Sequence, residues 1–158
     1  MRFEDAVRAH AAELYRYAYW LTRDRARAED VVQEALLRGW RAFPRLREPE
    51  AARAWLFSIV RNEFRRAVGA DPREQSLEGV DIPDERSDAA GLELRDALRA
   101  LPPAYGEPLA LQVLGGFSGA EIADLLGTTE GAVMTRLTRA RQALKRLVSP
   151  RARAGGRP

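Results

Sequence analysis

Apolar residues recur every three or four positions over most of the 158-residue chain, which is the spacing of one face of a helix. Three such stripes lie within the first 68 residues. They are Phe3, Val7, Leu14, Ala18 and Leu21, then Ala28, Val31, Val32, Ala35, Leu36 and Phe43, and then Trp55, Leu56, Ile59, Val60 and Phe64. Asp24 can cap the second helix, and Pro49 suits the first turn of the third. The pattern predicts a compact three-helix bundle over residues 1–68.

Helical spacing returns in the second half of the chain. The apolar positions are Leu94, Leu98 and Leu101, then Tyr105, Leu109 and Val113, then Ile122, Leu125 and Leu126, and finally Val133, Leu137, Ala140, Leu144 and Leu147. Pro102 and Pro103 interrupt the first two groups, and Gly115 and Gly116 close the second. These groups predict four further helices.

Residues 69–90 lose this periodicity and hold two glycines, two prolines and a surplus of acidic residues. That composition is typical of a flexible linker. We find no strand pattern and no internal repeat. The sequence therefore predicts an all-α protein of two small helical domains joined by an acidic linker. The predicted boundaries are residues 1–68, the linker 69–90, residues 91–150 with a helix-turn-helix, and a basic tail over 151–158.

The segment 118–147 has the signals of a helix-turn-helix. Ser118 and Glu121 form a capping-box pattern, Gly127 ends the first helix, and Thr128 or Thr129 can cap the second. Spacings of four and six residues relate a small residue, a turn glycine and an apolar anchor, which are Ala123, Gly127 and Val133. The second helix of this motif can lie in the major groove of DNA.

Charge strengthens the DNA-binding interpretation only when it is examined by segment. The net charge of +3 hides a balance of +4 over residues 1–70, −9 over 71–130 and +8 over 131–158. The basic residues of the last helix are Arg136, Arg139, Arg141, Lys145 and Arg146, and no acidic residue follows Glu130. Cationic side chains on one helix can bind phosphate or guanine. The alternative is an ordinary helical hairpin with a solvated basic face.

Composition removes most enzyme classes. The chain has no cysteine and one histidine, His10, so it lacks disulfides, thiolate metal sites and cysteine nucleophiles. We expect no catalytic residue, no bound metal ion and no cofactor. Charged residues occur every few positions at the N-terminus, which argues against a signal peptide. No apolar run approaches the roughly 20 residues that span a bilayer. We therefore expect a cytoplasmic protein with no segment inserted in a membrane.

Two faces of the first domain are candidate contact surfaces. Glu29, Asp30, Gln33 and Glu34 share the second helix, where they form either a protein-docking face or a plain solvated one. In the third helix, aromatic residues alternate with basic residues and an amide, a composition that suits single-stranded nucleic acid. Trp55 and Phe64 are predicted to belong to the core stripe. The contact candidates on this helix are Asn62, Arg65 and Arg66.

Three segments together resemble bacterial sigma factors of the extracytoplasmic-function (ECF) group. The segments are AEDVVQEALLRGWRAF, AWLFSIVRNEFRR and, after the acidic linker, ALRALPPAYGEPLALQVLGGFSGAEIADLLGTTEGAVMTRLTRARQAL. The resemblance covers roughly residues 5–148. It implies a subunit that docks on RNA polymerase core, captures the melted −10 element with its first domain and reads the −35 element as duplex with its second.

The resemblance also assigns roles to individual residues. By this resemblance, the core-docking helix holds Asp30, Gln33 and Glu34. The −10 strand is expected to meet Asn62 at a base pocket, and its backbone is expected to meet Arg61, Arg65 and Arg66. The −35 duplex is expected to meet Thr135, Thr138 and Arg139, with Arg136 on nearby phosphate. Met134 departs from the pattern, because relatives often have Lys or Arg at its position. The −35 preference of this chain is therefore expected to differ.

The partners implied are RNA polymerase core, promoter DNA and an anti-sigma factor that holds both domains. Two other functions stay open from the sequence. A stand-alone helix-turn-helix regulator would bind duplex DNA without polymerase and would need neither the docking helix nor the Arg61–Asn62 pair. A sigma-like decoy would occupy an anti-sigma protein and would not support transcription.

Overall fold

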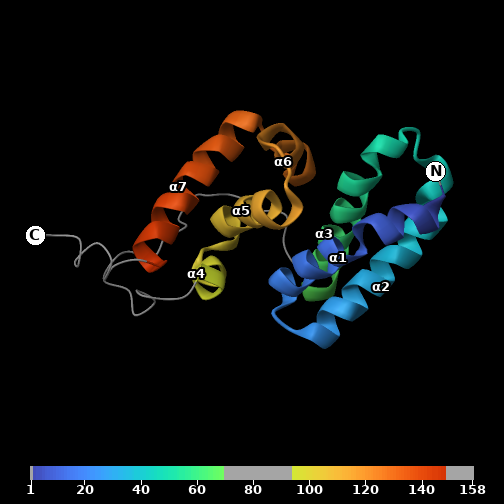
Figure 1. The fold of residues 1–158 in the computed structure, drawn as a ribbon, viewed down its shortest axis with the longest axis horizontal. Coiled ribbons are helices and arrows are strands. Elements are labelled where there is room, and N and C mark those ends of the chain that lie inside the picture. The colour runs from blue at the N-terminus through green and yellow to red at the C-terminus, as the bar shows by residue number, and fades with distance from the viewer. Residues whose placement is uncertain (1, 70–93, 149–158) are drawn as a thin grey trace, which may run out of the picture. The chain divides into compact units, whose positions relative to one another are not determined.

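The computed structural model describes residues 2–69 and 94–148, and the chain divides into two compact units, residues 1–71 and 72–158 (Figure 1). The described residues form seven α-helices and two short 3-10 turns, without a strand. The prediction of an all-α chain with two small helical domains is confirmed. The predicted linker, except for Gly69, and the predicted basic tail lie outside the described residues.

The first unit is a three-helix bundle of α1 (Phe3–Thr22), α2 (Arg25–Ala42) and α3 (Ala52–Val68), in which each helix contacts the other two (Figure 1). Asp24 caps α2 as predicted, since its Oδ1 accepts a hydrogen bond from the backbone N–H of Arg27 at 3.2 Å. The 3-10 turn η1 (Phe43–Arg45) follows α2. Pro49 begins the second turn, η2 (Pro49–Ala51), which runs directly into α3.

The core of the first unit contains Leu14, Tyr17, Val32, Leu56, Phe57 and Val60, each no more than 1% exposed. The prediction that Trp55 and Phe64 belong to this core is wrong in detail, because both are half-buried. Phe57 is the fully buried aromatic residue of α3, and its ring lies 5.2 Å from that of Tyr17 on α1. The core face of α3 therefore includes Leu56 and Phe57, and α1 supplies the aromatic partner of Phe57.

The second unit contains α4 (Leu94–Ala100), α5 (Pro103–Gly115), α6 (Gly119–Leu126) and α7 (Glu130–Val148). The other three helices all contact α7, which makes it the central element of this unit. Buried side chains from every helix form the core, among them Leu98, Tyr105, Leu109, Leu111, Ile122, Val133, Leu137 and Leu147.

One apolar position of the helical pattern in this unit lies outside the core. Val113 is 59% exposed, although it continues the apolar spacing of Tyr105 and Leu109. Gly106 lies seven residues earlier, on the same side of α5, and is buried. Packing on that side therefore ends before the last turn of the helix, while the apolar periodicity continues.

Candidate nucleic-acid interface

The helix-turn-helix predicted from the sequence is present in α6 and α7. Both bonds of the capping box form: Ser118 Oγ accepts from the backbone N–H of Glu121 at 3.2 Å, and Glu121 Oε1 accepts from that of Ser118 at 2.9 Å. Gly127 ends α6 with a φ of +67°, a left-handed conformation that glycine adopts without a steric penalty. Ala123 is 5% exposed and Val133 is fully buried, so the motif has its close approach and its anchor.

The start of α7 is fixed by a cap. Of the two threonines considered, Thr129 is the residue that caps, since its Oγ1 accepts from the backbone N–H of Ala132 at 3.1 Å. Val133, Leu137 and Ala140 then face the core and are fully buried. The opposite face of α7 carries Met134, Thr135, Thr138 and Arg139, all exposed.

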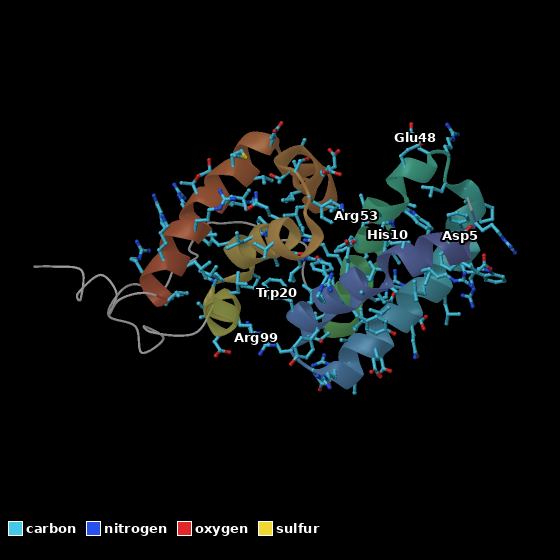
Figure 2. All side chains as sticks on the ribbon, in the orientation of Figure 1. Asp5, His10, Trp20, Glu48, Arg53 and Arg99 are labelled. Atoms are coloured by element: carbon cyan, nitrogen blue, oxygen red, sulfur yellow. The ribbon has the colours of Figure 1, made fainter. Side chains whose placement is uncertain are left out.

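Arginines dominate the remaining surface of α7, and Figure 2 shows nitrogen-bearing side chains projecting from this helix. Arg139 is exposed, whereas Arg136 is half-buried and its Nε is a buried atom without a hydrogen-bond partner among the described residues. Arg141 Nη2 donates to Gln112 Oε1 on α5. Arg139 is thus the predicted −35 residue whose cation is most available, and Arg136 keeps only part of its side chain at the surface.

The four −10 candidates lie on successive turns of α3 and differ in accessibility. Asn62 and Arg66 are exposed, Arg65 is half-buried and Arg61 is 6% exposed. Helical geometry rotates each residue about 100° from the one before, so Asn62 projects outward although Arg61 and Glu63 on either side are buried. The structure presents Asn62 and Arg66 at the surface of α3. Arg61, in contrast, is buried.

The predicted docking face of α2 is exposed and larger than expected. Asp30, Gln33 and Glu34 are exposed, together with two apolar residues that sequence reasoning missed, Leu37 at 50% and Trp40 at 61%. Leu37 and Trp40 lie four and seven residues after Gln33, so they share its side of the helix. The helical spacing of Leu37 and Trp40 from Gln33 could have identified them as part of this face, whereas their hydrophobicity alone suggests burial. The result is an exposed face with acidic, amide and apolar groups.

An ion pair links this docking helix to the helix that carries Asn62. Arg38 Nε on α2 lies 2.6 Å from Glu63 Oε2 on α3. The Glu63 side chain is 11% exposed and that of Arg38 is 42% exposed. Because Glu63 adjoins Asn62 in sequence, this contact helps to set the rotation of α3 relative to α2.

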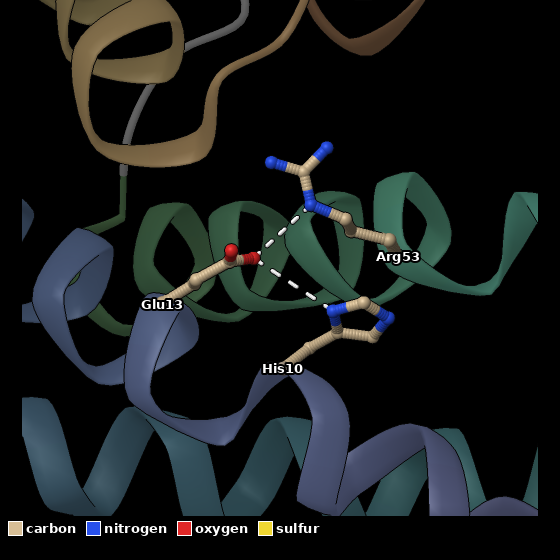
Figure 3. A network of polar contacts seen from close by, with 3 residues as sticks. All are labelled: His10, Glu13 and Arg53. Carbon is tan, nitrogen blue, oxygen red and sulfur yellow. Dashed lines mark hydrogen bonds and ion pairs between the residues drawn. The ribbon is translucent and has the colours of Figure 1, made fainter.

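A second polar network joins α1 to α3 in the same unit. Glu13 Oε2 lies 3.0 Å from Arg53 Nε and 3.7 Å from His10 Nδ1 (Figure 3). The Arg53 guanidinium also lies 5.8 Å from the centre of the Phe57 ring. Arg53 therefore connects a half-buried carboxylate on α1 to the buried aromatic pair, an arrangement that stabilises the bundle.

Metal-binding clusters and membrane-spanning helices are both absent from residues 2–69 and 94–148. Neither range contains a group of three or more His, Cys, Asp or Glu residues placed to hold a metal ion. None of the helices in these ranges is long and apolar enough to cross a membrane.

Comparison with known proteins finds the same two-part organisation. The model of Sigma-70 region 2 matches residues 6–72, and that of Sigma-70, region 4 matches residues 91–144. ECF RNA polymerase sigma factor SigL of Mycobacterium tuberculosis is 41% identical over 148 residues, covering 86% of this chain and 82% of SigL. ECF RNA polymerase sigma factor EcfG of Rhodopseudomonas palustris is 32% identical over 155 residues, covering 91% of this chain and 83% of EcfG.

Two solved structures are also similar. The sigma factor RpoE of Bartonella quintana, in complex with the anti-sigma factor NepR, gives a TM-score of 0.73 at 28% identity, covering 92% of this chain and 96% of that chain. CnrH, in complex with the cytosolic domain of CnrY, gives a TM-score of 0.71 at 26% identity, covering 94% of this chain and 88% of that chain.

Proposed function

Because the chain belongs to the ECF family of RNA polymerase sigma factors, we propose that it directs transcription initiation through three contact surfaces. The α2 face docks on core polymerase, the α3 face captures the melted −10 element, and the α7 face reads the −35 element as duplex. The observation that carries this proposal is the presence of both sigma regions in one chain, each with its predicted contact helix partly exposed. The polymerase, not this chain, performs the chemistry.

The docking surface is the exposed face of α2 formed by Asp30, Gln33, Glu34, Leu37 and Trp40. A few residues, often tryptophan, supply much of the binding energy at protein interfaces, and surrounding polar groups supply orientation and specificity. Trp40 is the anchor of this surface, Leu37 adds apolar contact area beside it, and the two carboxylates face basic groups of the polymerase.

The −10 surface is the exposed part of α3. Asn62 carries an amide that can both donate to and accept from the edge of an unpaired base. Arg66, one turn further along, is exposed and able to hold phosphate. Arg65 and Arg61 complete the proposed set with less accessible side chains. Capturing unpaired bases stabilises melted DNA relative to duplex, because these contacts do not exist in the paired state.

The −35 surface is the exposed side of α7, in which Thr135, Thr138 and Arg139 face bases and Arg136 faces phosphate. The recognition helix of a helix-turn-helix places its N-terminal turns against base edges. Each good base contact contributes roughly 1–3 kcal/mol of discrimination, so a few contacts are enough to select a promoter.

Regulation by a protein partner is part of the proposal. Two similar structures are complexes, RpoE with the anti-sigma factor NepR and CnrH with the cytosolic domain of CnrY. We infer that an anti-sigma factor also binds this chain and that both proteins meet in the cytoplasm. Such a partner would stabilise the state it binds by mass action.

Promoter-binding measurements separate the three candidate functions. Genomic promoter fragments are incubated with the chain alone, with core polymerase alone and with both. A sigma subunit needs both proteins for specific binding, whereas a stand-alone regulator binds tightly without core. A decoy gives no specific promoter binding, either alone or together with core polymerase. Arg139→Ala is expected to weaken binding of the complete holoenzyme, with Arg8→Ala, an equal loss of charge on α1, as the control.

A further inference from the structure

Met134 is the exposed apolar residue on the DNA-facing side of α7. It is 49% exposed and lies in the second turn of a helix that begins at Glu130. Its neighbour across the motif is Gly119, the first residue of α6: a Cβ added there would lie 3.1 Å from Met134 Sδ. The thioether therefore rests on a glycine, and the absence of a side chain at position 119 leaves room for it.

The two threonines beside Met134 direct their hydroxyl hydrogens into the helix. Thr135 Oγ1 donates to the carbonyl of Gly131 at 3.1 Å, and Thr138 Oγ1 donates to the carbonyl of Met134 at 2.9 Å. Each hydroxyl has only one hydrogen. What these side chains offer to a ligand is a methyl group and an oxygen lone pair.

This part of the surface consequently differs from the rest of α7. Between Glu130 and Thr138 the side chains exposed to solvent are Glu130, Met134, Thr135 and Thr138. They provide apolar contact area and hydrogen-bond acceptors, and the cation of the segment, Arg136, is half-buried. Full positive charge at the surface begins with Arg139.

The major groove contains one group that such a surface fits. Thymine presents a C5-methyl group there, which apolar side chains recognise, and its partner adenine presents an amino donor. Guanine presents two acceptors, which require cationic or other donors. We propose that Met134 is a specificity-determining residue that contacts the C5-methyl group of a thymine in the −35 element. This inference rests on the proposed function, in which α7 reads −35 duplex.

Gly119 is the residue that positions Met134. Because the nearest atom to an added Cβ is the end of a flexible side chain, an alanine at 119 displaces the thioether without straining the backbone. Alanine is also a better helix former than glycine, so the fold is preserved. Gly119→Ala therefore changes the placement of Met134 while keeping the methionine itself.

The test removes one methyl group from the DNA and one side chain from the protein. The −35 element is first selected from a randomised library with holoenzyme. Each thymine in it is then replaced by uracil, which lacks only the C5-methyl group, and promoter binding is measured. For wild-type holoenzyme we expect about a fourfold loss of affinity at one thymine, the effect of roughly one buried methyl-sized group. Met134→Ala should abolish that loss, Met134→Leu should keep most of it and Gly119→Ala should reduce it.

Each outcome bears on the proposal. Equal uracil sensitivity in wild type and Met134→Ala at every position would overturn it, as would a selected element without a required A·T pair. Met134 is exposed, so its replacement leaves no cavity in the core, and unchanged thermal unfolding verifies this. Holoenzyme that binds without any −35 requirement contradicts the proposed function instead, so the two failures are distinguishable.

Discussion

Asn62 carries an exposed amide on α3, and the residues on either side of it in the sequence are buried. Arg61 is 6% exposed and Glu63 is 9% exposed, while the Glu63 carboxylate is held by Arg38. The backbone under Asn62 is therefore fixed by packing on both sides. A contact residue on a rigid element loses little conformational entropy when it binds, which favours affinity.

Replacing Asn62 by alanine tests the −10 surface. We expect holoenzyme affinity for a template with an unpaired −10 strand to fall by about tenfold, which is within the roughly 1–3 kcal/mol attributed to one base contact. Binding to a fully duplex −35 fragment should not change. Equal affinities of variant and wild type for the unpaired template would show that Asn62 does not contact the base.

Trp40 provides the matching test of the docking surface. Trp40→Ala should weaken binding to core polymerase by about 30-fold, the effect of losing one aromatic anchor worth roughly 2 kcal/mol. Val68→Ala is the control, since Val68 is a comparably exposed apolar residue on α3 of the same unit. Similar losses in both variants, measured by titration of labelled chain with core, would argue against a specific anchor on α2.

Exposure at the residue scale was only partly predictable from the sequence. Thr135, Thr138 and Arg139 lie on the outer face of α7, as helical periodicity required. Arg61 is buried although arginine is usually exposed, and Trp40 is exposed although tryptophan is usually covered. The exposure of both residues depends on where neighbouring helices begin and end, and the local spacing of apolar residues does not encode this.

Helix ends were the most predictable elements, because the capping residues act locally. Asp24, Ser118 and Gly127 each occupy the cap expected of them. Contacts between helices were less predictable. The pairing of Arg38 with Glu63 joins residues 25 positions apart, and neither has a local pattern that identifies its partner.

The Arg38–Glu63 pair should respond unequally to removal of its two members. Arg38→Ala leaves a carboxylate that is only 11% exposed without this partner, and we expect it to lower the free energy of unfolding by about 2–3 kcal/mol. Glu63→Gln leaves Arg38, which is 42% exposed and reaches water, so a cost of about 1 kcal/mol or less is expected.

Urea unfolding of the full chain measures both values. Equal destabilisation by the two substitutions would contradict the asymmetry. A charge-reversed double variant, with Arg38→Glu and Glu63→Arg, should recover part of the stability lost in Arg38→Ala.

At the scale of the whole molecule, the chain consists of two small helical units, and one sigma region matches each of them. Net charge is a poor guide here, because +3 is the sum of blocks of opposite sign. The basic block at residues 131–158 includes most of α7, the helix proposed to meet duplex DNA. Under the proposed function, the single chain carries separate surfaces for polymerase, for melted DNA and for duplex DNA, and the polymerase performs the chemistry.

Run-off transcription with core polymerase measures whether this chain directs initiation at promoters. Core alone, and core supplied with the purified chain, are incubated with genomic promoter templates and nucleotides. We expect discrete transcripts that require the chain and disappear when either the −35 or the −10 element is replaced. Core that binds the chain yet produces no promoter-specific transcript would contradict the proposed function.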